Sequence, residues 1–193
     1  QLEQLFATQN PNVVINCTAL REPMVSDAIN SINIYSLLPH RLEHLCRLHG
    51  VRLIQISSDG VFSGSRGGYS EDDFPDASAL YGIAKILGEV REKHAITIRT
   101  SIIGHELKSK TGLLEWFLSQ HKQCRCYTRS IFSGFPTIMF AQIIGDVILN
   151  RPELYGIYHV ASQPISKFYL LELAEKIYSK SIKIVPDDNV VID

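Results

Sequence analysis

Residues 51–60, with the sequence VRLIQISSDG, form a short apolar run that ends in two serines, an aspartate and a glycine. A continuous apolar run of this length is typical of a strand buried on both faces, as in a parallel sheet. Two similar runs lie before and after it, at residues 13–18 (VVINCT) and 95–103 (AITIRTSII). The three runs therefore predict strands of one buried, parallel sheet.

Helical segments separate these strands. Residues 27–49 carry leucine and isoleucine at helical spacing; Pro39 should kink or break this helix, and Gly50 should end it. A second helix is predicted at about 79–93, after a glycine-rich stretch at 59–78 that predicts a long loop. Strands that alternate with helices in this way indicate an α/β domain with right-handed parallel crossovers.

The pattern after Gly104 is less regular. Residues 156–162 (GIYHVAS) predict a fourth buried strand, and the segment that follows predicts an amphipathic helix with Ser166 as its N-cap. Shorter elements are predicted near residues 113–120 (helix), 124–128 (strand), 140–150 (helix) and 182–186 (strand). We therefore expect a less regular lobe beside the main sheet.

The composition is that of an ordinary globular protein. The 193 residues are 45% hydrophobic and 20% charged, and the net charge is −1 from 19 basic and 20 acidic residues. This balance indicates no nucleic-acid surface and no basic membrane tail. No apolar run approaches the ~20 residues that span a bilayer, and the N-terminal segment QLEQLFATQN lacks the features of a signal peptide. We expect a cytoplasmic protein without nucleic-acid or membrane partners.

Four cysteines occur, and they show neither a C-x-x-C pair nor the spacing of a zinc site. Cys17 and Cys46 lie inside apolar runs, which predicts buried thiols. Cys124 and Cys126 alternate as in a strand and are expected on one face of it. Reduced thiols of this kind fit a cytosolic protein without a metal site.

Tyr81 and Lys85, in the sequence YGIAK, share one face at the start of the second predicted helix. Ser58 lies at the carboxyl end of the preceding predicted strand, where an open α/β sheet presents ligand-binding groups. Reduction of a ketone requires a proton for the new alkoxide. A tyrosine can donate that proton, a nearby ammonium lowers the pKa of the phenol, and a serine hydroxyl can fix the carbonyl oxygen. The three residues therefore predict a site for ketone reduction.

A Tyr-x-x-x-Lys pair alone is weak evidence, because an ordinary helix can carry it by chance. Its surroundings strengthen the prediction. The serine ends a strand, a glycine-rich loop follows it, and the tyrosine opens a helix that leads into another buried strand.

The pair and its surroundings resemble the extended short-chain dehydrogenase/reductases, and most of all dTDP-4-dehydrorhamnose reductase and related sugar-nucleotide 4-keto reductases. The segments that carry the resemblance are PNVVINCTA (11–19), LIQISSDGVFSG (53–64), YSEDDFPDASALYGIAKILGE (69–89), ITIRTSIIG (96–104) and GIYHVASQPISKFYLLELAEKI (156–177). The resemblance implies a partial doubly wound, Rossmann-type parallel sheet with a small C-terminal substrate lobe.

The same resemblance implies a division of the chain. Residues 1–104 would form a partial dinucleotide-binding domain that lacks its first βαβ unit. Residues 105–193 would form most of a substrate-binding lobe, with residues 156–162 returning to the main sheet.

The resemblance also implies NADP or NAD as the cofactor and a nucleotide sugar as the substrate. Tyr81 matches the proton donor, Lys85 the residue that tunes it and holds the nicotinamide ribose, and Ser58 the residue that binds the substrate carbonyl. Asp59 matches an acidic neighbour in the same motif, and we count it among the catalytic candidates. The strand ends that would lie along the cofactor carry Asn16, Cys17, Thr18 and Ser57.

Three residues of the second half are further candidates for substrate binding. His105 follows the third predicted strand, at the edge of the sheet where ligands bind. Trp116 lies in a region that faces the sugar nucleotide in the family, and packing within the lobe is its alternative role. Arg129 could meet a diphosphate, since anionic substrates favour arginine, and a solvent-exposed charge is the alternative.

Two features depart from the family pattern. Gly60 stands where members close to the rhamnose enzyme carry an aromatic residue, so the identity of the sugar in the substrate stays open. Nothing before Val13 resembles the glycine-rich turn that cradles the pyrophosphate of the cofactor. By resemblance about 50 further residues would precede this chain. We therefore expect the chain to be part of a longer protein.

These expectations combine into NAD(P)H-dependent reduction of a 4-keto-6-deoxy nucleotide sugar, for deoxysugar and polysaccharide biosynthesis. A sugar-nucleotide epimerase or dehydratase shares the Tyr/Lys pair, and Asp59 keeps the dehydratase open. A non-catalytic regulatory or binding protein is a third alternative, because the regulatory subunit of methionine adenosyltransferase is a relative of that kind. A homodimer is plausible by resemblance, through the helix of Tyr81 and Lys85.

Overall fold

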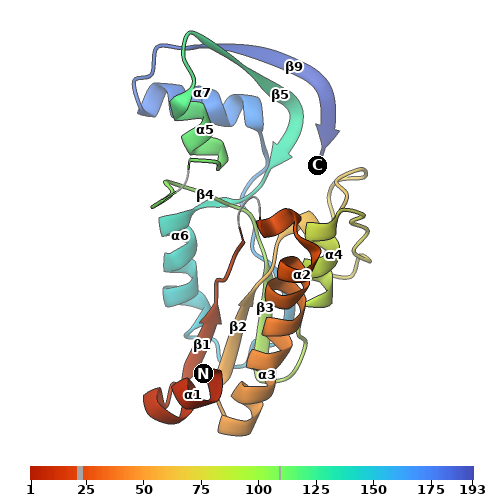
Figure 1. Ribbon diagram of the computed structural model, residues 1–193. Helices are drawn as coiled ribbons and strands as arrows, with labels where there is room; N and C mark the ends of the chain where they lie inside the picture. The colour runs from red at the N-terminus through yellow and green to blue at the C-terminus, as the bar shows by residue number, and fades with distance from the viewer. Residues whose placement is uncertain (21–23, 109) are drawn as a thin grey trace. The chain divides into compact units, whose positions relative to one another are not determined.

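The computed structural model describes residues 1–20, 24–108 and 110–193 (Figure 1). These residues divide into two compact units. The first contains residues 1–63, 70–100 and 148–160, and the second contains residues 64–69, 101–147 and 161–193. Both units are therefore built from segments that are discontinuous in the sequence.

A four-stranded sheet forms the centre of the first unit. All of its strand pairs are parallel, and the strand order is β1 (Val13–Asn16), β2 (Arg52–Ile56), β3 (Ala95–Arg99), β7 (Gly156–His159). Ile54, Ile96 and Ile98 are fully buried, as expected for strands covered on both faces. The four predicted strands and the predicted parallel sheet are confirmed. The predicted 95–103 strand, however, ends at Arg99 and resumes elsewhere as β4 (Ile102–Ile103).

A long helical segment connects β1 to β2. It begins as α2 (Ala28–Ser31), passes through a wider turn, η2 (Ile32–Leu37), and continues as α3 (Leu38–His49). Pro39 lies in the first turn of α3 and has no N–H for the carbonyl four residues before it, so the wider turn falls where a break was predicted. Gly50 ends α3 in the left-handed conformation with φ of 66°, as predicted.

The core of the first unit lies between this segment and the sheet. Figure 1 shows α2, α3 and α4 on one side of the strands. An N-terminal helix, α1 (Leu2–Gln9), adds to the same core, and a short turn, η1 (Met24–Ser26), precedes α2. The buried apolar cluster comprises Phe6, Leu42, Leu45, Cys46, Val51, Leu53, Val90 and Ala95.

The second helix, α4 (Leu80–Leu87), is shorter than predicted. It ends at Gly88, where any Cβ would collide with the Tyr35 carbonyl oxygen. The chain then turns toward the sheet, because the Thr97 hydroxyl donates to the Val90 carbonyl at 2.7 Å and accepts from the Val90 N–H at 3.1 Å. The predicted extension to residue 93 was therefore wrong, since tertiary contacts end the helix earlier.

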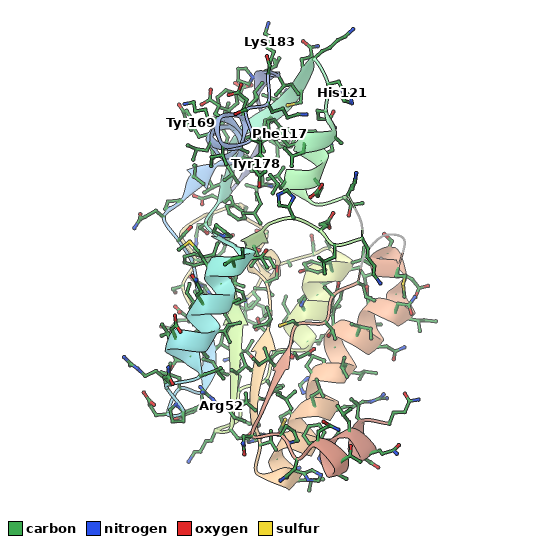
Figure 2. All side chains as sticks on the ribbon, turned by 90° about the vertical axis from the view of Figure 1, so that its left-hand side faces the viewer. Arg52, Phe117, His121, Tyr169, Tyr178 and Lys183 are labelled. Carbon is green, nitrogen blue, oxygen red and sulfur yellow. The ribbon has the colours of Figure 1, made fainter. Side chains whose placement is uncertain are left out.

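Arg52 fixes the segment that returns the chain to the sheet. Its guanidinium donates to the carbonyl oxygens of Ile148 at 2.7 Å, Arg151 at 2.8 Å and Leu154 at 3.3 Å. Figure 2 labels this side chain at the end of the sheet where β2 begins. Three carbonyl groups before β7 are thereby paired by one side chain.

The second unit is built around a three-stranded sheet. Its order is β8 (Ile165–Ser166), β5 (Gln123–Phe132), β9 (Lys183–Ile192), and a separate pair joins β4 to β6 (Phe135–Pro136). The helical elements are α5 (Leu113–Ser119), α6 (Thr137–Gln142), η4 (Ile143–Ile148, which reaches the unit boundary) and α7 (Lys167–Ile177). β5 and β9 extend well beyond the predicted short strands, because they pair with each other along most of their length.

Helices α5 and α7 and strand β5 enclose the core of the second unit. Its buried residues are Leu114, Phe117, Cys124, Cys126, Leu171 and Ala174, and Phe117 is labelled in Figure 2. Ser166 caps α7 as predicted, since its hydroxyl accepts from the Tyr169 N–H at 3.2 Å. In the part of the chain that the structure describes, no helix is long and apolar enough to cross a membrane.

The cysteines follow the sequence-based prediction with one exception. Cys46, Cys124 and Cys126 are buried, and the last two share the inner face of β5. Cys17 is exposed, so its predicted burial was wrong. It comes after the last residue of β1 and is therefore outside the covered part of the sheet. Across residues 1–20, 24–108 and 110–193, no group of three His, Cys, Asp or Glu residues could hold a metal ion.

Candidate active site

Ser58 follows the carboxyl end of β2 in an ordered turn. The backbone continues to pair beyond the strand, because the Ser57 N–H donates to the Ile98 carbonyl at 2.7 Å and the Asp59 N–H to the Thr100 carbonyl at 3.3 Å. The buried Ser58 hydroxyl accepts from the Gly60 N–H at 3.0 Å and donates to Asp59 Oδ1 at 3.1 Å. Ser58 is thus held at the sheet edge at which parallel α/β sheets bind ligands.

Two glycines allow α4 to begin close to this turn. A Cβ at Gly82 would collide with the Gly60 carbonyl oxygen, so the helix approaches the turn more closely than any other residue permits. A Cβ at Gly60 would lie 3.1 Å from Tyr81 Cε1 and 3.3 Å from Ser58 Oγ. The Gly60 position therefore borders both the phenol ring and the serine hydroxyl.

Tyr81 and Ser58 are in contact. Burial raises the pKa of the Tyr81 phenol, and a hydrogen bond with the Ser58 side chain opposes this rise. Weaker repulsions from Tyr35 and Asp59 add to the rise. At neutral pH the phenol is therefore protonated and can donate a proton.

Lys85 lies one helical turn after Tyr81 and is 7% exposed. Its Nζ donates to the Ile56 carbonyl at 3.2 Å and lies 4.7 Å from the centre of the Tyr35 ring. Burial lowers the pKa of this ammonium from 10.5 to about 8, and attraction to Cys17 and Glu89 acts against the decrease. Lys85 is thus a cation at neutral pH, although one close to losing its proton.

Tyr35 is a member of this site that sequence reasoning missed. Its ring meets the Tyr81 ring edge-on, with centroids 5.3 Å apart. Its hydroxyl accepts from the Leu20 N–H at 2.6 Å and donates to the Leu20 carbonyl at 3.1 Å. No local motif marks this residue. Only the packing of η2 against α4 brings its ring into contact with both Tyr81 and Lys85.

The residues expected along the cofactor lie at the carboxyl ends of β1 and β2. Asn16 is buried, donates to Gln55 Oε1 at 2.7 Å, and accepts from the Thr18 hydroxyl at 2.7 Å. Cys17 and Thr18 are exposed directly after it. Ser57 is buried and donates to Glu89 Oε1 at 3.0 Å, so its hydroxyl points to protein rather than to an open surface.

The structure brings one group of the predicted site residues together. Ser58, Asp59, Tyr81 and Lys85 lie together within the first unit, where Ser58 donates to Asp59, Tyr81 lies beside Ser58, and Lys85 donates to the carbonyl of Ile56 at the end of β2. His105, Trp116 and Arg129 belong to the second unit.

Within the second unit these three residues have different surroundings. His105 is exposed, with Nδ1 2.6 Å from Glu115 Oε1 and Nε2 2.9 Å from the hydroxyl of Tyr178. Trp116 is half-buried and packs against the core of the unit, which fits the packing alternative. Arg129 is exposed on β5, which fits the alternative of a solvated charge.

Solved structures with the same fold cover almost all of this chain. A hypothetical dTDP-4-dehydrorhamnose reductase from Sulfolobus tokodaii superimposes with a TM-score of 0.83 at 23% identity, over 98% of this chain and 69% of that one. The dTDP-4-dehydrorhamnose reductase from Bacillus anthracis, in complex with NADP, gives a TM-score of 0.81 at 23% identity, over 97% and 70%. The Rossmann-type α/β fold implied by the sequence is thereby confirmed.

Curated relatives are more similar in sequence but match over shorter regions. Methionine adenosyltransferase 2 subunit beta from Bos taurus is 37% identical over 83 residues, which are 41% of this chain and 24% of that protein. Its counterpart from Danio rerio is 35% identical over 177 residues, 79% of this chain and 51% of that protein. A dTDP-4-dehydrorhamnose reductase from Streptomyces griseus is 36% identical over 91 residues, 43% and 28%. The chain thus spans between a quarter and about half of the length of these relatives.

A family match extends over nearly the whole sequence. The family described as the RmlD substrate binding domain matches residues 1–186. The match includes Ser58, Tyr81 and Lys85 as well as the second unit up to residue 186. On this evidence the chain belongs to the RmlD substrate binding domain family.

Proposed function

We propose that the protein reduces the 4-keto group of a 6-deoxy nucleotide sugar with NADPH or NADH. The observation that carries the proposal is that Tyr81 and Lys85 of α4 both lie against the carboxyl end of β2, Tyr81 beside Ser58 and Lys85 with its Nζ 3.2 Å from the Ile56 carbonyl. The similarity to dTDP-4-dehydrorhamnose reductases supports this substrate class. The proposal includes the division of the chain expected from the sequence, with residues 1–104 as a partial dinucleotide-binding domain that lacks its first βαβ unit. Residues 105–193 would form most of a substrate-binding lobe, with 156–162 in the main sheet.

The chemistry of the site fits a nicotinamide cofactor. When bound, the cofactor supplies a hydride to the carbonyl carbon. Lys85 is suited to bind the ribose hydroxyls, because an ammonium has three N–H donors. Among the described residues, its Nζ donates a hydrogen bond to the Ile56 carbonyl. Asn16, Cys17 and Thr18 would lie along the cofactor at the end of β1, and Ser57 at the end of β2. The Bacillus anthracis structure in complex with NADP supports a nicotinamide cofactor.

The proton would come from Tyr81. Its raised pKa keeps the phenol protonated at neutral pH. The Lys85 cation, one helical turn away, would stabilise the phenolate that remains after transfer. The Ser58 hydroxyl would bind the carbonyl oxygen and hold it within reach of the phenol. Because the Lys85 pKa is about 8, the phenolate loses its cation above this pH. Turnover is therefore expected to decline as the pH rises through about 8.

The substrate side of the proposal involves the second unit. Arg129 is the candidate for the diphosphate, because its exposed guanidinium is available for anion binding. Trp116 and His105 are the candidates for contacts to the nucleotide sugar, although Trp116 also packs in the core and His105 is paired with Glu115.

A dehydratase or epimerase is the nearest alternative activity. Asp59 favours it, because its exposed acidic side chain accepts a hydrogen bond from Ser58 and could take part in proton transfer beside the carbonyl. Product analysis separates the alternatives, since a reductase consumes one reduced cofactor for each sugar whereas an epimerase or dehydratase regenerates its cofactor.

A regulatory role is the second candidate function. The observation that favours it is the similarity to methionine adenosyltransferase 2 subunit beta, which extends over 177 residues in the Danio rerio protein. Under this alternative the chain would bind a catalytic subunit, and Tyr81 would not be needed for a reaction.

The decisive experiment compares Tyr81→Phe with Tyr155→Phe in the full-length protein. Tyr155 is 50% exposed and serves as the matched control. We expect Tyr81→Phe to lower the rate of cofactor oxidation with a 4-keto nucleotide sugar by 10²-fold or more, within the range of acid–base catalysis. Cofactor binding, measured by calorimetry, should persist in both variants. Full turnover of Tyr81→Phe would refute the reductase, and absence of cofactor binding to the wild-type protein would favour the regulatory role.

A homodimer belongs to the same proposal. Ile83 and Leu87 lie one turn apart on α4 and are 42% and 57% exposed, which supports an apolar contact through this helix. Sedimentation of the wild-type protein and of Ile83→Lys tests it. The substitution should convert a dimer into a monomer, and a monomeric wild-type protein would contradict the proposal.

A further inference from the structure

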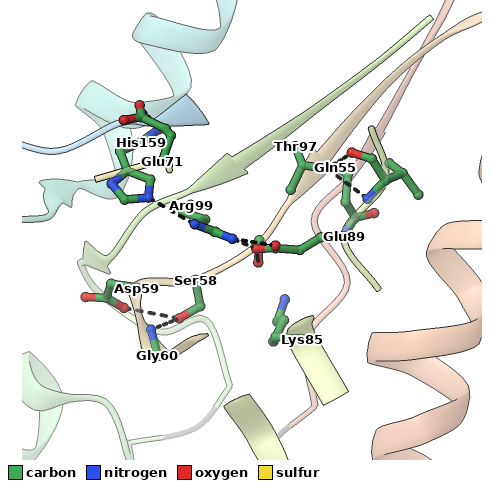
Figure 3. A network of polar contacts seen from close by, with 12 residues as sticks. Gln55, Ser58, Asp59, Gly60, Glu71, Lys85, Glu89, Thr97, Arg99 and His159 are labelled. Carbon is green, nitrogen blue, oxygen red and sulfur yellow. Dashed lines mark hydrogen bonds and ion pairs between the residues drawn. The ribbon is translucent and has the colours of Figure 1, made fainter. Parts of the chain in front are cut away.

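A buried carboxylate, Glu89, joins two strand ends in the first unit (Figure 3). Glu89 Oε1 accepts from Arg99 Nε at 2.8 Å and from the Ser57 hydroxyl at 3.0 Å, while Oε2 accepts from Arg99 Nη2 at 2.8 Å. The side chains of Glu89 and Arg99 are 4% and 1% exposed. Glu89 thus forms a bidentate ion pair with Arg99 and also accepts a hydrogen bond from the Ser57 hydroxyl.

Each partner comes from an element that carries part of the proposed active site. Glu89 directly follows Gly88, which ends the helix of Tyr81 and Lys85. Arg99 is the last residue of β3. Ser57 directly follows β2 and directly precedes Ser58. Glu89 therefore connects the end of α4 to the residue next to the serine of the site.

Contacts of the Arg99 guanidinium with other residues fix the orientation of the ion pair. Arg99 Nη1 lies 3.3 Å from His159 Nε2 at the end of β7, and its guanidinium lies over the Phe62 ring at 5.0 Å. The backbone N–H of His159 donates to Glu71 Oε1 at 2.8 Å, which ties the 59–78 loop to the same network. Glu89 is thus confined by a guanidinium that cannot turn freely.

Stability alone does not account for this arrangement. A buried ion pair is often no more stabilising than apolar side chains of the same volume, because both charges lose their hydration. The hydrogen bond from Ser57 adds a directional contact to the residue beside Ser58. A positioning role explains why that contact accompanies the pair.

We propose that Glu89, held by Arg99, is a positioning residue that fixes Ser57 and through it the Ser58 hydroxyl against Tyr81. The inference rests on the proposed function for its effect on turnover. The geometric part, the dependence of the Ser58–Tyr81 contact on Ser57 and Glu89, requires no substrate and can be measured without activity.

A second effect of the same carboxylate acts on Lys85. Attraction to Glu89 opposes the decrease that burial causes in the Lys85 pKa, which lies at about 8. Without the Glu89 charge, Lys85 would lose its proton at a lower pH. The carboxylate thus helps keep the ammonium charged at neutral pH.

The main test compares Ser57→Ala with Ser57→Thr in the full-length protein. Ser57→Ala removes the hydrogen bond to Glu89 but leaves the ion pair, so the protein should fold normally. We expect kcat to fall about tenfold, because small displacements of reacting groups carry large rate effects. Ser57→Thr retains the hydroxyl and should restore kcat to within about twofold of the wild-type value.

The substrate-free readout is the titration of Tyr81, followed by NMR of protein with ¹³C-labelled tyrosine and assigned with Tyr81→Phe. The hydrogen bond between the Ser58 and Tyr81 side chains lowers the Tyr81 pKa, so its loss in Ser57→Ala should move the titration to higher pH. Ser57→Thr should titrate as the wild-type protein does.

A second variant, Glu89→Gln, removes the charge while keeping the shape. The titration of Lys85, measured by residue-resolved amine labelling against pH, should move to lower pH in this variant. If Glu89→Gln does not fold, Ser57→Ala alone decides.

The outcomes separate the two proposals. In a protein that turns over, an unchanged kcat or an unchanged Tyr81 titration in Ser57→Ala overturns the positioning role. In a protein that does not reduce a 4-keto sugar, the proposed function fails, and the Tyr81 titration by itself supports or overturns the role of Glu89.

Discussion

The two units of this protein hold their polar side chains in opposite ways. In the first unit, Glu89 and Arg99 form a pair that is sealed from water, with exposed fractions of 4% and 1%. In the second unit, the trio of Glu115, His105 and Tyr178 forms a comparable chain of contacts, but the His105 side chain is 59% exposed. Water can replace a lost partner at the surface, whereas a buried charge without its partner has no substitute.

The largest effect is expected from breaking the buried pair. Arg99→Ala should lower the free energy of unfolding by about 3–5 kcal/mol, because it leaves the Glu89 charge buried and uncompensated. Arg129→Ala, on the exposed face of β5, is the matched control and should change it by less than about 0.5 kcal/mol. Urea unfolding at pH 7 measures both. Similar decreases in the free energy of unfolding for the two variants would show that the burial of Arg99 does not make it more important for stability than Arg129.

Lys85→Met should stabilise the protein while removing activity. The folded-state pKa of Lys85 is about 8, below the ordinary 10.5, so the charged form is disfavoured in the folded state. Below pH 8 the full penalty is present, on the order of 3 kcal/mol, and it disappears as the pH rises from 8 to 10.5. The difference in unfolding free energy between variant and wild type should therefore decline over that interval.

The matched control for this prediction is Lys183→Met, on the exposed face of β9 (Figure 2). It should leave the stability nearly unchanged at every pH. A Lys85→Met variant that is no more stable than the wild-type protein at pH 7 would contradict the burial cost assigned to the ammonium.

Cys17 should be the reactive thiol of the chain. It is exposed, whereas Cys46, Cys124 and Cys126 are buried, so alkylation should be on the order of tenfold faster or more at Cys17. Desolvation of the thiol raises the Cys17 pKa, so the reaction should accelerate as the pH rises beyond the ordinary value of 9.0. Mass spectrometry of the labelled peptides measures the rates.

The cofactor proposal adds a further outcome to this labelling. NADPH or NADH should protect Cys17, because the residue lies at the end of β1 where the cofactor is proposed to bind. Cys124 and Cys126, in the second unit, should be unaffected. Equal labelling of Cys17 with and without saturating cofactor would place the cofactor elsewhere.

The smallest effect is expected in the exposed trio. Tyr178→Phe removes the hydroxyl beside His105 and should lower the free energy of unfolding by less than about 0.5 kcal/mol, because water replaces it. Tyr35→Phe, in the first unit, removes a buried hydroxyl that serves both backbone groups of Leu20 and should cost about 1–3 kcal/mol. Thermal unfolding of Tyr178→Phe and Tyr35→Phe tests whether the buried hydroxyl contributes more to stability than the exposed one.

Much of the fold was predictable because the signals are local. The apolar runs that form β1, β2, β3 and β7 are short and bounded by polar residues, and Ser166 and Gly50 mark helix ends through their own side chains or backbone. The predictions that were wrong depend on distant contacts. Gly88 ends α4 against the carbonyl of Tyr35, and Cys17 is exposed because β1 ends one residue before it.

The candidate site divides in the same way. Ser58, Tyr81 and Lys85 could be grouped from their spacing, since a strand end and one helical face bring them together. Tyr35 and Glu89 carry no such signal. Tyr35 joins the site only through the packing of η2 against α4, and Glu89 only through its contact with Ser57 after β2.

The sequence by itself determined the alternation of strands and helices and the chemical identity of the proton-donating trio, because periodicity and spacing are properties of the chain. Only the tertiary structure decided which charges are buried, and with them the pKa of Lys85 and the confinement of Glu89. Burial depends on residues that are far apart in sequence and adjacent in space, so the electrostatics of this site follow from the packed fold and not from the motif.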